Sequence, residues 1–180
     1  MTARPLKTVR WWLAIGGAAA ASSLVLPLPS ATAAAEDHAC VGNAETTYEG
    51  GLNKVKKPVV VDGKGSLTCM EKGGEMSSGS ITFSNRAAPG QLSCSGGNTS
   101  FTGQIDWADG TKSTFEAGKT ETHKQSGVTA LVFRGQVTGG EHQGKSLEGG
   151  FALSKDEDEQ ACGTKKGLTG SSGPFTLIFR

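Results

Sequence analysis

Beyond residue 36, apolar and polar side chains alternate with a period of two. In Ser80–Ser84, for example, Ile81 and Phe83 share one face and hydroxyl residues occupy the other. No segment in this part repeats apolar residues at i, i+3, i+4 and i+7 for more than two turns, as an amphipathic helix would. The pattern therefore predicts an all-β domain of eight to ten short strands.

The predicted strands are separated by gaps rich in Gly, Asn, Asp and Ser, which favour turns. The abundance of glycine fits many tight turns better than a linker. The strand candidates are 46–48, 57–62, 67–69, 80–84, 92–94, 100–107, 111–116, 128–138, 144–153 and 175–179.

The pair Asp109-Gly110 predicts a hairpin between two of these strands. A two-residue loop would place Phe115 on the face opposite Ile105 and Trp107. A three-residue loop, 108–110, brings these three apolar residues onto one face. Because a slip of one residue reverses every side chain, we predict the three-residue loop, with Gly110 in the left-handed conformation.

A second hairpin is predicted between 128–138 and 144–153, through a glycine-containing turn at 139–143. Consecutive hairpins form a meander, and a meander of eight or more strands closes into a barrel or folds into a sandwich, because exposed edges invite aggregation. The strand at 175–179 ends one residue before the terminus and suits a strand that closes the sheet. We predict a barrel, with a β-sandwich as the alternative.

Residues 1–35 have the pattern of a secretory signal peptide. Three basic residues and no acid precede an apolar stretch at 11–28, and small residues follow at 31–35. The apolar stretch is long enough to span a membrane, but no basic cluster follows it, so we favour cleavage after Ala35 over an uncleaved anchor. The chain is then a signal peptide, 1–35, and one secreted domain, 36–180.

Removing the leader changes the charge from +1 to −2, because three of the 18 basic residues and none of the 17 acids lie within it. A slightly acidic domain argues against a nucleic-acid partner and against an electrostatic role at a membrane surface. The domain keeps one tryptophan, one tyrosine and seven phenylalanines. This set gives little on which to stack a sugar or a flat ring.

All four cysteines lie in the exported part. An even count in an oxidising compartment predicts two disulfides. Three connectivities are possible, and we favour Cys69–Cys94 and Cys40–Cys162, the first joining neighbouring strands and the second clasping the start of the domain to a late segment. A zinc site is disfavoured because no Cys-x-x-Cys pair is present, and a catalytic cysteine because no thiol is left over.

The domain begins with Cys40-Val-Gly-Asn-Ala-Glu-Thr-Thr-Tyr48 and continues to Gly65-Ser-Leu-Thr-Cys69 and Leu92-Ser-Cys94. In these segments it resembles a group of small secreted proteins of high-GC Gram-positive bacteria. The resemblance implies export and disulfides, and it implies no activity, cofactor or site residue.

Candidate catalytic groups are few. His38, His123 and His142 each fall in a polar or glycine-containing segment and are expected to be solvated loop residues. No Gly-x-Ser-x-Gly motif is present, and the segment 170–173 is expected to be a flexible lead into the last strand. A secreted hydrolase is therefore the least favoured of the functions considered.

One acidic run, 154–160, offers Asp156, Asp158 and Glu159 as calcium ligands. The run lacks the glycine and the distal glutamate of an EF-hand loop, so a solvated loop is the favoured interpretation. We predict no metal and no cofactor. The sequence favours a non-catalytic extracellular binding module for an unknown ligand or protein, with an inhibitor of an extracellular enzyme as the alternative.

Overall fold

Ten antiparallel strands make up the computed structural model, which describes residues 38–71, 73–125, 128–153 and 160–180. Helix is confined there to a short segment at 160–162. The strands are β1 (Ala39–Leu52), β2 (Lys57–Met70), β3 (Met76–Ser84), β4 (Gly90–Ser93), β5 (Gly96–Asn98), β6 (Phe101–Trp107), β7 (Lys112–Gln125), β8 (Val128–Gly140), β9 (Ser146–Leu153) and β10 (Leu168–Phe179).

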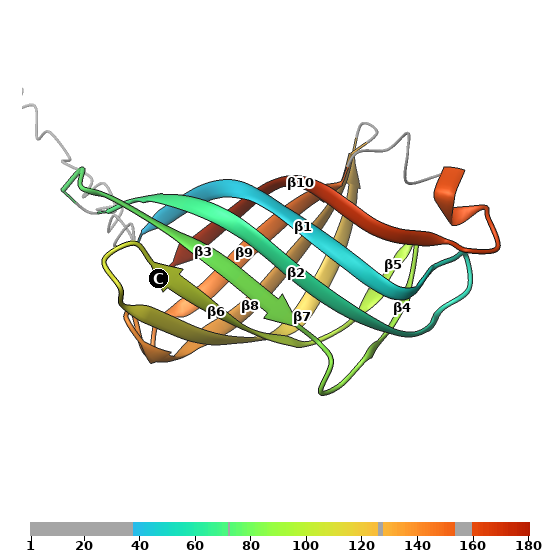
Figure 1. The fold of residues 1–180 in the computed structure, drawn as a ribbon, viewed down its shortest axis with the longest axis horizontal. Coiled ribbons are helices and arrows are strands. Elements are labelled where there is room, and N and C mark those ends of the chain that lie inside the picture. The colour runs from blue at the N-terminus through green and yellow to red at the C-terminus, as the bar shows by residue number, and fades with distance from the viewer. Residues whose placement is uncertain (1–37, 72, 126–127, 154–159) are drawn as a thin grey trace, which may run out of the picture. The chain divides into compact units, whose positions relative to one another are not determined.

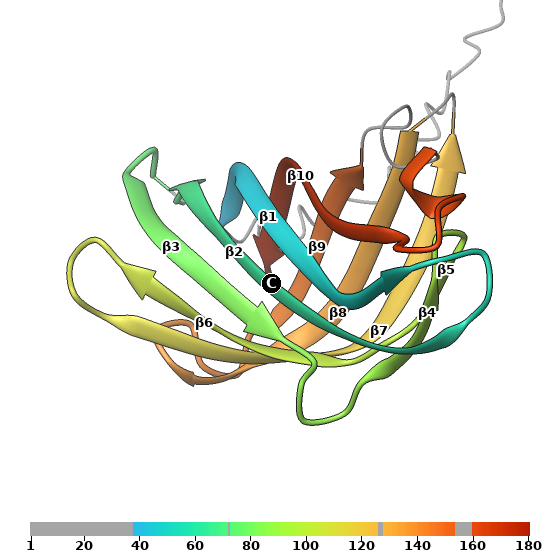
Figure 2. The same ribbon diagram turned by 45° about the vertical axis from the view of Figure 1, so that its right-hand side comes forward.

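Eight of these strands close into a barrel, as predicted (Figures 1 and 2). Each strand pairs with the next along the chain, except that β3 pairs directly with β6. The short β4–β5 hairpin between them pairs with β2 at one end of the barrel. Closure comes from β1, which pairs with both β2 and β10.

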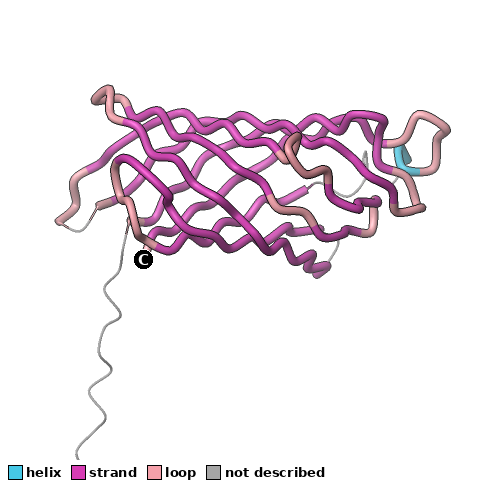
Figure 3. Tube along the Cα trace, turned by 90° about the horizontal axis from the view of Figure 1, so that it is seen from below, coloured by secondary structure: helices cyan, strands magenta, loops and turns pink. Residues whose placement is uncertain are grey.

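The two ends of the barrel differ in what covers them (Figure 1). The hairpin end carries β4, β5 and the segment 160–167. The terminal end carries the β6–β7 turn, the β8–β9 turn, the start of β1 and the end of β10. Figure 3 shows the short helix at the hairpin end, set apart from the strands.

The β6–β7 hairpin has the predicted register. Ile105 pairs with Ser113, and Asp106 pairs with Lys112. The loop is 108–110, and Gly110 has φ 88°. The apolar face predicted for this hairpin is therefore the face that points into the barrel.

Several strands are longer than predicted. β10 begins at Leu168, so 170–173 is not a flexible lead but part of the strand that pairs with β1. β7 runs on to Gln125, which places His123 on a strand opposite Ala130 rather than in a polar connection. Polar and glycine residues are accommodated in both strands because the neighbouring strand supplies the backbone hydrogen bonds.

Large side chains and glycines alternate across the inner face of the barrel. Gly103 pairs with Phe115, and Gly149 pairs with Phe133. A β-carbon on Gly103 would lie 2.3 Å from the Phe115 ring, and one on Gly149 would lie 2.0 Å from the Phe133 ring. Part of the glycine content thus makes room for aromatic rings, which the assignment of glycine to turns missed.

Two apolar clusters fill the inside. The larger extends from the terminal end and includes Trp107, Phe115 and Phe179. The smaller, hereafter the lid cluster, lies at the hairpin end. Its buried members are Tyr48, Leu52, Val59, Leu92 and Leu168. Burial of this apolar area is the main stabilising term for such a domain.

Two disulfides are present, but the favoured pairing was wrong. Cys40 bonds Cys69, and Cys94 bonds Cys162. Cys40 and Cys69 are directly opposite each other on β1 and β2. Cys94 lies at the tip of the β4–β5 hairpin, which pairs with the start of β2 at the hairpin end of the barrel, so Cys94 meets the 160–167 segment instead of Cys69. Two disulfides are compatible with an extracellular location.

In the described ranges, no helix has the length and hydrophobicity needed to span a membrane. The predicted signal peptide, 1–35, and the run with Asp156, Asp158 and Glu159 lie outside the described residues.

Candidate functional site

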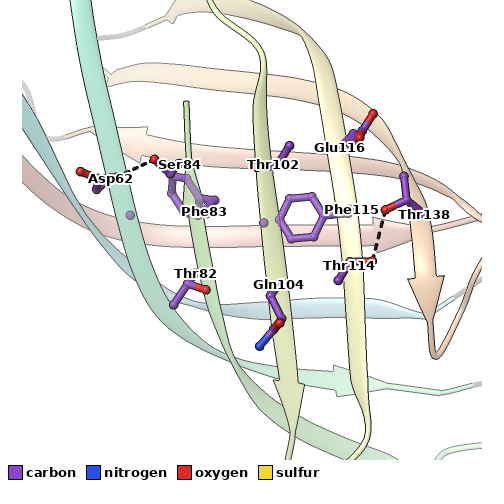
Figure 4. Close-up of a pocket in the computed structure, with 12 residues that line it drawn as sticks. Asp62, Thr82, Phe83, Ser84, Thr102, Gln104, Thr114, Phe115, Glu116 and Thr138 are labelled. Carbon is purple, nitrogen blue, oxygen red and sulfur yellow. Dashed lines mark hydrogen bonds between the residues drawn. The ribbon is translucent and has the colours of Figure 1, made fainter. Parts of the chain in front are cut away.

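A recess of about 600 Å³ lies on the outer face of the barrel, across β2, β3, β6, β7 and β8 (Figure 4). We call it the outer groove. Hydroxyl, amide and carboxylate side chains surround it. They are Asp62, Thr82, Ser84, Thr102, Gln104, Thr114, Glu116 and Thr138.

Strand register places these side chains in two rows that run across the strands. One row is Thr82, Gln104 and Thr114, and the other is Asp62, Ser84, Thr102 and Glu116. Each row member alternates along its strand with an inward residue, so the outward face is polar because the inward face is apolar. The outer groove is thus made by the same alternation that predicted the strands.

A β-bulge in β8 completes the lining. Thr114 pairs with Gly139 while the next residue, Phe115, pairs with Val137. Thr138 is therefore the extra residue of the bulge, and bulges commonly redirect a side chain. The Thr138 hydroxyl lies 3.2 Å from that of Thr114, which ties the bulge to the groove.

An ion-pair network borders one end of the groove. Ser84 Oγ donates to Asp62 Oδ1 at 2.6 Å, and Arg86 lies 2.6 Å from Asp62 Oδ2. Arg86 also contacts Glu49. The Ser84 hydrogen bond, and then Arg86, hold the pKa of Asp62 below its usual value. Asp62 is therefore a carboxylate at neutral pH and a weak base.

The second carboxylate of the groove belongs to Glu116, which is exposed. No ion pair to Glu116 is present among the described residues. Glu116 and Asp62 are three strand spacings apart along their row, about 14 Å. Paired glycosidase carboxylates are at most roughly 9.5 Å apart. The groove thus offers separated hydrogen-bonding groups rather than an acid–base pair.

At the hairpin end, Cys94 and Cys162 pack on the lid cluster. The backbone N–H of Cys94 also donates to the carbonyl of Asn53 at 2.8 Å. The disulfide therefore holds the β4–β5 tip against the barrel as a lid. The alternative function, an enzyme inhibitor, would need a loop that projects from the surface, whereas this tip is held against the barrel.

Below the lid, three hydroxyl groups form a cluster inside the barrel. Ser171 Oγ lies 2.8 Å from both Thr46 Oγ1 and Tyr48 OH, and Thr46 donates to Tyr48 at 3.0 Å. Ser171 belongs to the segment 170–173, which the sequence predicted to be a flexible lead into the last strand. Its neighbours are hydroxyls, with no imidazole to activate it.

The histidines do not lie where the sequence suggested. His38 and His142 were expected to be solvated, but their side chains are 17% and 10% exposed. They meet at the terminal end, with ring centroids 4.5 Å apart. Within the described ranges, no three or more His, Cys, Asp or Glu side chains are grouped so as to hold a metal ion.

Sequence reasoning did not identify the outer groove. Its residues come from five strands, and each is an ordinary outward polar position in its own segment. The available signal was the register of the β6–β7 hairpin, which already placed Gln104 opposite Thr114 and Thr102 opposite Glu116. No comparable pattern in the sequence predicted the bulge in β8.

Comparison of the chain with protein-family models, with curated proteins and with solved structures gave no match.

Proposed function

We propose that this protein is an exported, non-catalytic binding module that holds an extended segment of a partner polypeptide in the outer groove. The observation that carries the proposal is the lining of that groove, in which hydroxyl, amide and carboxylate groups from five strands face one recess. Such groups provide hydrogen bonds to the backbone and polar side chains of a peptide.

The disposition of the aromatic residues supports a peptide over a sugar or a flat ring. Of the nine aromatic side chains after residue 35, none is exposed. Phe83 and Phe101 are half-buried against the larger core cluster, and the other seven are buried. Phe83 and Phe115 also line the groove, but Phe115 is fully buried and Phe83 half-buried, so a ligand there would be held mainly by hydrogen bonds and charge rather than by stacking.

The size of the groove suits a short extended segment. Five strands span four spacings, about 19 Å, and an extended peptide rises roughly 3.3 Å per residue. About six residues would cross the groove from β2 to β8. Glu116 provides a negative charge for one basic side chain of such a segment, since Asp62 already binds Arg86.

Export is the second part of the proposal, and it rests on the pattern of residues 1–35 together with the two disulfides. Expression with the native leader, followed by N-terminal sequencing of protein from the culture medium, tests it directly. We expect the chain to begin at Glu36. Retention of the full-length chain in the cells would contradict export.

Selection of displayed random hexapeptides against the full chain, followed by calorimetry, tests the groove. We expect the selected peptides to contain a basic residue and to bind Glu116→Gln and Thr102→Val at least tenfold more weakly. Thr169→Val, an exposed threonine on β10 outside the groove, is the matched control and should bind normally. Failure to select any peptide, or equal binding to all variants, would refute the proposal.

A further inference from the structure

Two of the three histidines of the chain come together at the terminal end of the barrel. His38 precedes β1, and His142 lies in the β8–β9 turn with a left-handed backbone, φ 63°. The His142 ring centroid is 4.9 Å from that of Phe179 and 5.5 Å from that of Trp107. The pair therefore covers the larger apolar cluster at this end.

The two rings lie in a largely apolar site. His38 Nδ1 is buried and has no hydrogen-bond partner among the described residues. Moving a charge into an apolar site is costly unless the charge is paired and hydrogen-bonded. Two imidazolium ions at this separation would also repel each other.

Charged groups approach the pair from two sides. Glu71, at the end of β2, has Oε2 3.9 Å from His38 Nδ1, and Glu141 has Oε1 3.9 Å from His142 Nδ1. Lys145 adds positive charge from the β8–β9 turn.

Two further cations of this end, Lys112 and Arg180, form ion pairs with other residues. Lys112 contacts Asp106, and Arg180 contacts Glu148. They therefore add little to the field at the two imidazoles.

Burial is the largest influence on His142 and lowers its pKa, followed by the neighbouring His38. Glu141 and Glu71 oppose this shift, and Lys145 reinforces it. The net direction is downward, so the folded chain binds a proton at His142 less readily than the unfolded chain does.

We propose that His38 and His142 form an acid-sensitive closure of the barrel, in which the two packed rings seal the terminal end and proton uptake at His142 loosens the start of β1 and the β8–β9 turn. The direction in which stability changes with pH follows from the difference in proton binding between the folded and the unfolded chain. Well above the unperturbed histidine pKa of about 6.5, His142 is neutral in both the folded and the unfolded chain, and its contribution to stability is constant. As the pH falls below that value, the unfolded chain takes up protons first and stability declines.

Trp107 reports directly on the closure because its ring contacts His142 edge to face. In a full chain carrying Trp11→Phe and Trp12→Phe, all tryptophan fluorescence comes from this residue. A protonated imidazole quenches an adjacent indole. We expect a sigmoidal loss of fluorescence on acidification with its midpoint below pH 6.5, and a fall of several degrees in melting temperature between pH 7.5 and pH 5.

His142→Asn should remove both effects, and asparagine tolerates the left-handed backbone. His123→Asn is the control, since His123 lies on β7 ten residues beyond Ser113, and it should keep them. If His142→Asn does not fold, the His38→Asn variant tests the closure instead. Loss of the neighbouring ring should move the fluorescence midpoint to higher pH, which a purely structural role would not do. An unchanged midpoint, or the same pH profile in His142→Asn as in His123→Asn, would refute the closure.

Discussion

The ring of Phe115 occupies the space that a side chain at Gly103 would need. The two residues are direct cross-strand partners on β6 and β7, both on the inner face. The same arrangement recurs where Phe83 lies over Gly63 and Phe133 over Gly149. At these three places the barrel interior is packed by setting a phenylalanine ring opposite a glycine, which resembles the alternation of large and small residues seen in small barrels.

Gly103→Ala should destabilise the fold. The new β-carbon would lie 2.3 Å from the Phe115 ring and 2.6 Å from the Thr82 carbonyl oxygen, so both must shift. Overpacking of this kind costs about 1–3 kcal/mol in unfolding free energy. Urea denaturation measures the loss. Gly118→Ala on β7, which has open space around its β-carbon, is the matched control and should be neutral or stabilising.

Ser113→Ala should weaken the terminal end. Ser113 accepts a hydrogen bond from Trp107 Nε1 at 2.9 Å and donates one to the Glu141 carbonyl at 2.6 Å. The variant leaves the buried indole N–H without its acceptor, which costs about 1–3 kcal/mol. Thermal unfolding checks the loss. Ser172→Ala, at an exposed position on β10, should leave the melting temperature unchanged. An equal effect in both variants would contradict the assigned role.

Asn85→Ala should destabilise the region where the chain leaves β3. Asn85 is 3% exposed and accepts from the Val61 backbone N–H at 2.7 Å. Its side-chain amide donates to the Val59 carbonyl at 3.0 Å. Leaving these backbone groups unsatisfied costs about 1–3 kcal/mol. Chemical denaturation should show the loss for Asn85→Ala and none for Asn43→Ala, whose side chain is exposed on β1.

Unreduced peptide mapping should recover Cys40 linked to Cys69 and Cys94 linked to Cys162. Replacing Cys94 and Cys162 by alanine removes a cross-link spanning 68 residues, which the chain-entropy model values at about 4 kcal/mol. Hydrogen exchange should then rise first in β4, β5 and the lid cluster. Uniform loss of protection, reaching β6 at the terminal end equally, would show that the disulfide does not act as a local lid.

Ser84→Ala should raise the pKa of Asp62 toward its usual value, because the Ser84 hydrogen bond is the largest cause of its depression. Arg86→Gln should raise it as well, because Arg86 lowers this pKa through both a hydrogen bond and its charge. Since the folded-state pKa is depressed, the carboxylate stabilises the fold above about pH 4, and this contribution is lost as the pH falls through the folded-state value. Carboxyl NMR titration of the two variants measures both rises. An unchanged Asp62 pKa in either variant would contradict the assigned cause.

The sequence predicted those features that depend on alternation along one strand or across one turn. The β6–β7 register followed from the need to keep Ile105, Trp107 and Phe115 on one face, and barrel closure followed from the number of strands. The disulfide pairing, in contrast, depended on the path that the chain takes between the cysteines. Cys40 and Cys69 lie at equal distances from the β1–β2 turn, a symmetry that would have revealed the pair once both strands were extended to their full length.

The functional features were harder to predict because they depend on several strands at once. Asp62 and Glu116 belong to one row only after four strands are aligned. His38 and His142 are far apart in the chain, and each looks like a loop residue in its own segment. Their burial results from the way β1 and the β8–β9 turn reach the same end of the barrel.

The pairing of β1 with β10 described above also bears on how the chain acquires its structure. The first strand, β1, and the last strand, β10, pair from Ala39 opposite Ile178, so the ladder between them joins the most distant segments of the domain. Contacts of such long sequence separation slow folding, because loop-closure entropy must be overcome before they form. Until β10 arrives, β1 and β9 each keep an unpaired edge that invites association with other chains. A chain kept unfolded until all of it has crossed a membrane would avoid that exposure.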